Sequence, residues 1–245
     1  MEQADSPISS QLVTSRVLAG SATYEHTPRE RGLSRGRNRG LGHISQGIVA
    51  FPDDDCFYPD DLLRSVADIF DTGVDGVAVS QRTFRGADSM LRWEKNEVKV
   101  TKFNIPRTIN SSTIFLSADI VREVGTFATD LGAGAGTKFG AGEENDFVLR
   151  AISVGADIVY RPDLFVYQAD WREELPPAEV VQKAVAYNRG FGRVLRINRL
   201  YGQGLYWIIR SAVGLVAALG NADRRRLQWA HLRGRVSGFM SSPRR

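Results

Sequence analysis

Three consecutive carboxylates, Asp53, Asp54 and Asp55, follow a short apolar run from Ile48 to Phe51, which has the length of a buried strand rather than a helix. Carboxylates crowded this closely repel one another and raise each other's pKa unless positive charge lies between them. A divalent cation that prefers hard oxygen ligands, Mg²⁺ or Mn²⁺, would supply that charge and could bridge to the phosphates of a substrate. Aspartate is also common in turns, so a solvated turn remains an alternative interpretation at this point.

A basic segment precedes the acidic cluster and has four arginines in nine residues, from Arg31 to Arg39. Leu33, Arg37 and Leu41 are spaced as on one face of a helix. Arginine forks bind phosphate in a bidentate manner, so these side chains could form a phosphate-binding wall beside the carboxylates. The alternative is an exposed basic turn or helix.

A glycine-rich segment from Leu131 to Gly142 leads into Glu143, Glu144 and Asp146. Its five glycines in twelve residues predict a loop that can move or lie close to a ligand. It is not a Walker loop, because Thr137 stands where the glycine before the lysine is required. A carboxylate behind such a loop could act as a general base on a hydroxyl. Acidic residues are also ordinary in a first helical turn, and the spacing does not decide between these interpretations.

Short apolar runs alternate with helical segments and indicate an α/β fold. A strand that ends in carboxylates places them at the carboxyl edge of a sheet, where open α/β sheets bind ligands. We expect Asp60 to cap the helix that contains Leu62, Val66 and Phe70. The other expected elements are a possible strand at Ala22–His26, strands at Ile48–Phe51, Gly76–Ser80, Ser112–Leu116, Ala156–Tyr160 and Leu164–Tyr167, and helices at Ala118–Val124 and from Glu143.

The composition is that of a globular protein, with 42% hydrophobic and 24% charged residues in 245. The single cysteine, Cys56, excludes an internal disulfide framework and fits a reducing compartment. Because no apolar segment opens the chain, no secretory signal is expected. From Lys183 onward 13 basic residues and one acidic residue give +12, which leaves −8 for residues 1–182 of a chain with net charge +4. A basic tail on an acidic body indicates contact with a polyanion.

The tail begins at Pro176-Pro177 and is expected to be helical over residues 178–198 and over Leu205–Leu219. The second helix is too short and, with Arg210, too polar to span a bilayer. An interfacial helix, followed by Arg224–Arg226 and Trp229 for anionic headgroups, is one interpretation. A helix that covers the sheet or forms a dimer interface is the other.

The order of these motifs resembles the family 2 glycosyltransferases of the GT-A fold, in particular bacterial enzymes that act on cell-envelope polysaccharides. The likeness covers residues 22–170 and is carried by Gly32-Leu33-Ser34-Arg35-Gly36-Arg37-Asn38, Phe51-Pro52-Asp53-Asp54-Asp55-Cys56, and Gly142-Glu143-Glu144-Asn145-Asp146 with Arg150. Tyr160-Arg161-Pro162 and the glycine-rich loop also fit.

The resemblance implies a nucleotide-diphosphate sugar donor, a glycan or lipid-linked hydroxyl acceptor, and Mg²⁺ or Mn²⁺. Asp53-Asp54-Asp55 is the counterpart of the DXD motif, with Asp55 as main metal ligand and Asp53 on the donor ribose or the metal. The resemblance places Arg35, Arg37 and Asn38, with Asp54, at the donor. It implies an inverting reaction in which Glu144, or alternatively Asp146, is the base.

Two positions depart from the family pattern. Met1–Asp5 looks like the residues just after the family's second strand, so the first strand, first helix and most of the second strand are expected to be absent. Either the true start lies upstream or the protein is reduced. Gln168 stands where many relatives have a metal-binding histidine, and its amide oxygen would be a weaker ligand.

The sequence therefore predicts an incomplete GT-A domain over residues 1–177, a mixed sheet flanked by helices that lacks its first strands, and a basic amphipathic helical tail over residues 178–245. We expect a metal-dependent glycosyltransferase in the cytoplasm, peripheral on the inner face of the plasma membrane. The alternative is a non-catalytic GT-A-like remnant that binds a membrane or protein. Nucleic acid is not an expected partner, because the arginines of the tail do not alternate with stacking aromatics.

Overall fold

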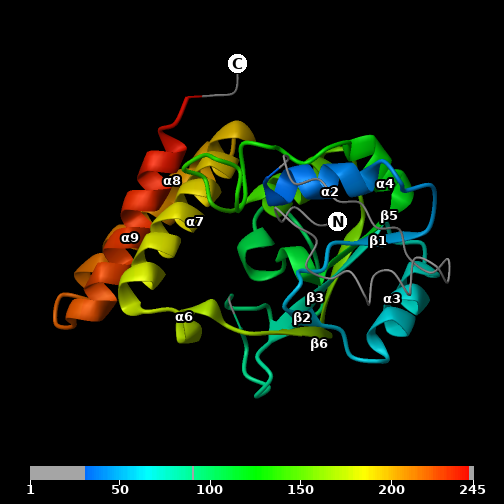
Figure 1. Cartoon of the computed structure of the whole chain (residues 1–245), viewed down its shortest axis with the longest axis horizontal. Helices are drawn as coiled ribbons and strands as arrows, with labels where there is room; N and C mark the ends of the chain where they lie inside the picture. The colour runs from blue at the N-terminus through cyan, green and yellow to red at the C-terminus, as the bar shows by residue number, and fades with distance from the viewer. Residues whose placement is uncertain (1–30, 90, 243–245) are drawn as a thin grey trace.

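A mixed β-sheet with helices on both faces forms the body of the molecule, and three long helices stand beside it (Figure 1). The computed structural model describes residues 31–89 and 91–242. The strand expected at Ala22–His26, and the segment Met1–Asp5, lie outside these residues. The α/β fold class predicted from the sequence is confirmed.

The sheet of the described residues has six strands in the order β1-β5-β3-β6-β2, with β4 paired to β6 beside this path. Only β3 and β6 are parallel, and the remaining pairs are antiparallel. The strands are β1 (Ile48–Ala50), β2 (Cys56–Phe57), β3 (Gly76–Arg82), β4 (Val98–Lys99), β5 (Ile114–Ser117) and β6 (Ile158–Gln168).

The helices follow the apolar spacing of the sequence. They are α2 (Leu33–Leu41), α3 (Leu62–Phe70), α4 (Ala118–Val124), α5 (Glu143–Ser153), α6 (Trp171–Glu174), α7 (Pro177–Ile197), α8 (Tyr201–Val216) and α9 (Ala222–Phe239), with short 3-10 turns at Ile105–Arg107 and Ser111–Thr113. Helix α4 ends at Gly125, as expected from the sequence, with the glycine in a positive-φ conformation (φ +80°).

The first residues of strand β3 are apolar on both faces because both faces of the strand are covered. Val77 and Val79 point toward α3, in a cluster with Leu62 and Val66. Ala78, between them, points to the larger core on the other face, which is covered by α4 and α5. Successive side chains of a strand alternate between faces, so a central strand covered on both sides reads as a continuous apolar run.

Three local expectations are wrong by small amounts. Asp61, not Asp60, occupies the N-cap position of α3, where its side chain makes no capping hydrogen bond and the backbone N–H of Leu62 closes a turn onto the carbonyl of Pro59. The strand expected from Ser112 begins at Ile114, because Asn110 and Thr113 form a capping box around a 3-10 turn. The two strands expected around Pro162 are one strand, β6: the register with β3 shifts from Arg161 to Phe165, so the intervening residues bulge out.

Strand β1, which precedes Asp53, Asp54 and Asp55, is also more exposed than expected. Strand β1 pairs with β5 alone among the described residues, and Ile48 on it is 42% exposed. It was predicted to be buried. An apolar run of three or four residues gives no sign of whether its strand lies at the centre or the edge of a sheet.

Helices α7, α8 and α9 pack against one another at one end of the molecule (Figure 1). Helix α7 begins at Pro177, the second residue of the proline pair that was expected to start the tail. The division into two domains at this point stays a prediction. Among the described residues, no helix has the length and apolar character needed to cross a membrane.

Candidate active site

Antiparallel pairing of β1 with β5 brings two distant segments together. Ala50 lies opposite Phe115, so the residues after β1 meet those before β5. Asp53 follows β1 and Ser111 precedes β5, and the hydroxyl Oγ of Ser111 donates to Oδ2 of Asp53 at 3.1 Å. The carboxylate is thereby fixed in direction by a neighbouring strand end.

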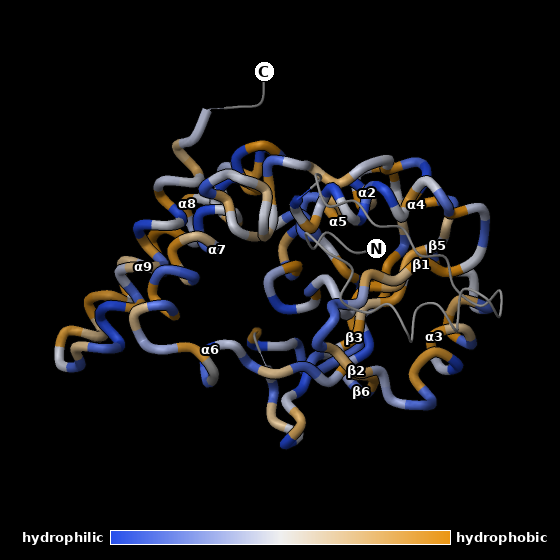
Figure 2. The backbone as a smooth tube through the Cα atoms, viewed as in Figure 1, coloured by the Kyte–Doolittle hydropathy of each residue, from blue (hydrophilic) through white to orange (hydrophobic). Residues whose placement is uncertain are grey.

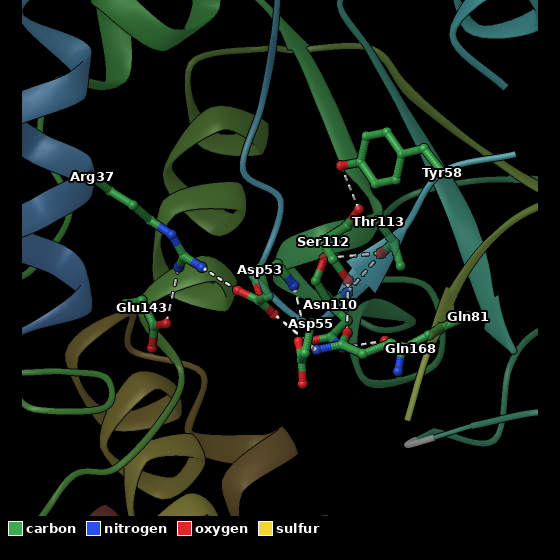
Figure 3. Close-up of polar contacts among 11 residues, drawn as sticks. Arg37, Asp53, Asp55, Tyr58, Gln81, Asn110, Ser112, Thr113, Glu143 and Gln168 are labelled. Carbon is green, nitrogen blue, oxygen red and sulfur yellow. Dashed lines mark hydrogen bonds and ion pairs between the residues drawn. The ribbon is translucent and has the colours of Figure 1, made fainter. Parts of the chain in front are cut away.

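Pairing of β2 with the end of β6 brings Gln168 to the same carboxylates. Its amide Nε2 donates to Oδ1 of Asp55 at 2.5 Å and to Oδ2 of Asp53 at 3.4 Å. Its oxygen accepts from Oγ of Ser112 at 3.1 Å. Asp53 and Asp55 therefore converge on one point, which the amide nitrogen of Gln168 faces (Figure 3). Asp54 is exposed in the turn between them.

Arg37 joins the acids after β1 to the start of α5. Its Nη2 donates to Oδ1 of Asp53 at 3.1 Å, and its Nη1 donates to Oε1 of Glu143 at 3.0 Å. The side chain extends from α2 between the two carboxylates (Figure 3), and it is 8% exposed. One buried guanidinium thus bridges residues that are 90 positions apart in the chain.

Helix α2 holds Arg37 in place through contacts with the loop that precedes α5. The Asn38 amide bonds both backbone groups of Phe127, and Oγ of Ser34 donates to the carbonyl of Leu131. Asn38 was expected at the donor, but in the structure its amide fixes the loop. Arg35 is exposed and bonds the carbonyl of Arg31. Of the arginines that were expected to form a phosphate-binding wall, Arg37 contacts the carboxylates of Asp53 and Glu143.

The glycine-rich loop wraps the carboxylate of Glu143. An added Cβ on Gly132 would lie 2.8 Å from Oε2 of Glu143, and this buried oxygen has no hydrogen-bond partner among the described residues. Gly142 starts α5 in the left-handed region (φ +102°), where only glycine is unstrained, and a Cβ there would also meet Val194 on α7. The loop therefore fits closely around the start of α5.

Glu144 lies beside Glu143 and is partly buried. Burial raises the pKa of Glu144 to about 8, with a further contribution from the negative charge of Glu143. Asn145 donates to Oε1 of Glu144 at 2.8 Å. A carboxylate with a raised pKa is a stronger base than an ordinary one, which is what general-base chemistry near neutral pH requires.

Asp146, the alternative base, is held in a structural network. One oxygen accepts from Nε of Arg150 at 3.1 Å and the other from the amide of Asn198 at 3.0 Å. Arg150 in turn bonds the carbonyls of Val124 and Thr126. Asp146 therefore links α5 to the end of α7 and to the loop after α4.

Ser111, Ser112 and Tyr187 contact or face the site and were not singled out in the sequence. Tyr187 on α7 has a pKa raised to about 12, first by burial and then by the charges of Glu144, Glu143, Asp53 and Asp55. Its proximity to both acidic groups depends on how α7 packs, so no local sequence signal identifies it. Of the two serines, Ser112 was expected to belong to a strand.

A small pocket is lined by Arg37, Ser111 and Glu144 on its polar side and by apolar residues that include Phe51, Phe127 and Phe147. The basic, hydroxyl and candidate base groups thus border one space. Within the part of the chain that the structure describes, no group of three or more His, Cys, Asp or Glu side chains is arranged to hold a metal ion. Asp53 and Asp55 direct carboxylate oxygens toward one point, and Mg²⁺ and Mn²⁺ prefer hard oxygen donors of this kind.

Residues 10–121 match the family model described as Glycosyl transferase family 2. The family predicted from the sequence is confirmed over these residues, which include Arg37, Asp53, Asp55 and Ser111. Glu143, Glu144 and Gln168 lie beyond the match. No curated protein matches the chain.

Solved structures with a similar fold include S. aureus TarS 1-349, with a TM-score of 0.53 and 15% identity over 93% of this chain and 79% of that one. S. aureus TarS gives a TM-score of 0.52 and 17% identity over 96% of this chain and 47% of that one. The chain therefore spans about half the length of the latter. At this identity the likeness shows the fold alone, and the fold is the predicted GT-A fold.

Proposed function

We propose that this chain, in which residues 10–121 match the model of glycosyl transferase family 2, transfers a sugar from a nucleotide-diphosphate donor to a hydroxyl acceptor with inversion at the anomeric carbon. The observation that carries the proposal is the double contact of Arg37 with Asp53 and Glu143. Because Arg37 contacts both, the carboxylates that follow β1 and the acidic first turn of α5 lie in one site. Sugar transfer requires such an arrangement, in which the groups that bind the donor lie close to the base.

Glu144 is the proposed base. The acceptor hydroxyl oxygen attacks the anomeric carbon from the face opposite the diphosphate, and its proton passes to a carboxylate oxygen of Glu144. The new bond joins the acceptor oxygen to the anomeric carbon, while the bond from that carbon to the phosphate oxygen breaks and its electron pair leaves with the diphosphate. The raised pKa of Glu144 supports this role.

Asp53 and Asp55 are the proposed ligands of Mg²⁺ or Mn²⁺. Bound there, the ion would supply positive charge for the departing diphosphate. Arg37 orients Asp53, and Ser111 fixes the other oxygen of the same carboxylate. Gln168 could present its oxygen to the ion only after its amide rotates, because the nitrogen now faces both carboxylates.

The proposed acceptor is a glycan or lipid-linked hydroxyl of cell-envelope polysaccharide or glycolipid, and the proposed place of action is the cytoplasmic side of the plasma membrane. The support is the resemblance stated above, together with the basic C-terminal helices, in which residues 201–242 have six arginines and one acidic residue.

Donor turnover tests the proposal. Purified protein is incubated with UDP-sugars and GDP-mannose, with Mn²⁺ or Mg²⁺, and release of the nucleoside diphosphate is measured. We expect turnover by wild type and a loss of about a hundredfold or more in Asp55→Asn, which keeps the shape of the side chain but weakens its ligand character. Asp68→Asn, on the exposed side of α3, is the matched control and should keep full turnover. Absence of turnover with every donor would contradict the proposal.

A non-catalytic GT-A-like binding module is the second candidate. It is favoured by the amide of Gln168, which already donates to both candidate metal ligands. Calorimetry with UDP, GDP and Mn²⁺ separates the two functions, since a binding module of this kind would show no heat with any of them.

A further inference from the structure

Helix α8 exposes an apolar face to solvent. Leu205, Ile209, Val213 and Val216 are each 55–66% exposed and follow one another at helical spacing. Tyr201 at the start of the helix and Tyr206 beside Leu205 are also exposed, as is Leu219 after its end. A row of large aliphatic side chains in water is unusual for a folded monomer, and it marks an interaction surface.

The opposite face of α8 is fixed to α9. Ser211 is buried and accepts a hydrogen bond from Arg235 at 2.7 Å, and Arg235 also bonds the carbonyl of Trp207. An added Cβ on Gly204 would lie 2.2 Å from the ring of Phe239, so the two helices are in close contact there. The outer apolar face is therefore held in position by packing and needs no folding step to form.

Positive charge borders this face. Arg210 is exposed on α8 itself, next in sequence to Ile209. Arg224, Arg225 and Arg226 are exposed just beyond the C-terminal end of the helix, where Arg225 bonds the carbonyl of Leu219. The helix has no acidic residue, and Asp223 is the single one in residues 201–242. The charge around the apolar row is thus mainly positive, with Asp223 as the one acidic residue beside the arginines.

We propose that the outer face of α8, with its bordering arginines, lies on an anionic lipid surface. The aliphatic row would enter the interface while the arginines contact lipid phosphates. A second copy of the chain is a poorer occupant, because pairing through this face would bring two sets of arginines together. This inference names the membrane contact of the proposed enzyme, but the contact itself does not require sugar transfer.

Vesicle flotation tests the inference without a sugar donor. The full chain is mixed with vesicles of phosphatidylcholine alone or of phosphatidylcholine with phosphatidylglycerol, and the bound fraction is measured across salt concentrations. We expect binding to the anionic vesicles that weakens as salt rises. We expect the double variant Ile209→Ser and Val213→Ser to bind about tenfold or more weakly, because both side chains are exposed and their loss leaves the folded core intact.

The matched control replaces two other exposed aliphatic residues, Leu63→Ser and Val154→Ser, and should bind like wild type. Circular dichroism and thermal unfolding confirm that all variants fold. Failure of wild type to bind anionic vesicles would overturn the inference, as would equal binding by the α8 variant. A wild-type dimer in sedimentation that the α8 variant converts to a monomer, with no vesicle binding by either, would assign the face to a second copy instead.

Discussion

At the scale of single residues, Glu144 is the candidate base, and its pKa departs from the ordinary value of a carboxyl group. Burial and Glu143 raise its pKa to about 8. A base must be ionised to accept a proton, so we predict that kcat/KM for transfer rises with pH and levels off above about pH 8. Glu144→Gln should lower kcat by roughly a hundredfold or more on the plateau above pH 8, and the difference from wild type should shrink as pH falls. The pH–rate profiles of both proteins check this, and a wild-type profile without a rise toward pH 8 would contradict it.

The same carboxyl group links protonation to folding. Its pKa is higher in the folded chain than the ordinary value of 4.5, so folding favours its protonated form. The stabilisation is fully present below about pH 4.5 and is lost as pH rises through about 8. We predict that the free energy of unfolding of Glu144→Gln increases relative to wild type across this window. Urea unfolding at several pH values measures the difference, and a difference that does not change with pH would refute the linkage.

Arg37 is predicted to contribute to stability as well as to the site. It and Glu143 are both nearly buried, so Arg37→Met leaves a carboxylate without its cation and should cost roughly 3–5 kcal/mol. Adding Glu143→Gln removes that charge and should restore part of the loss. Lys95→Met breaks the exposed pair with Asp88 and should cost about 1 kcal/mol or less. Urea unfolding of the four proteins measures these differences, and equal costs for Arg37→Met and Lys95→Met would contradict the prediction.

At the scale of elements, the sequence is most informative where short apolar runs end at recognisable residues. The strand at Gly76–Ser80, the helix that ends at Gly125 and the helix that starts at Glu143 all appear in the structure. Pro162 gave the wrong boundary, because a bulge lets β6 continue through it, and that depends on pairing with β3. Long-range pairing has no local signal.

The candidate site shows the same limit. The sequence singled out the carboxylates because they follow a predicted strand or begin a predicted helix, and Arg37 because it lies in an arginine-rich segment. It could not show that Asn38 would bind the backbone of Phe127, or that Tyr187 would face the acids from α7. Both facts depend on how elements far apart in the sequence pack together.

The contact between α7 and the loop before α5 is predicted to require glycine. An added Cβ on Gly190 would lie 1.9 Å from the carbonyl oxygen of Ala141, so Gly190→Ala must push α7 away and should cost roughly 1–3 kcal/mol. Gly202→Ala on α8 has no atom within 4 Å and should be neutral or stabilise by up to about 1 kcal/mol. Thermal unfolding compares the two, and similar shifts would show that the contact can relax.

At the scale of the whole molecule, the charge imbalance of the sequence corresponds to two parts of the structure. Residues 1–182, with net charge −8, contain the sheet and the candidate site, whereas the +12 segment contains most of α7 and all of α8 and α9. Helix α7 contacts both parts, because it packs on α9 and on the loop before Glu143. With α8 on a membrane, as proposed, α7 would hold the candidate base at a fixed separation from the lipid.

Ligand binding to the site should stabilise the whole chain, since a ligand that binds only the folded state adds its binding free energy to stability. We predict that UDP or GDP with Mn²⁺, at about 100 times its dissociation constant, adds about 2.7 kcal/mol and raises Tm by roughly 5–10 °C. Chelation of Mn²⁺ should reverse the shift. Asp55→Asn should show little shift, while Asp68→Asn should respond like wild type, because its carboxylate is exposed on α3 away from the converging oxygens. A shift of equal size in Asp55→Asn would mean that the nucleotide and the ion bind elsewhere on the chain.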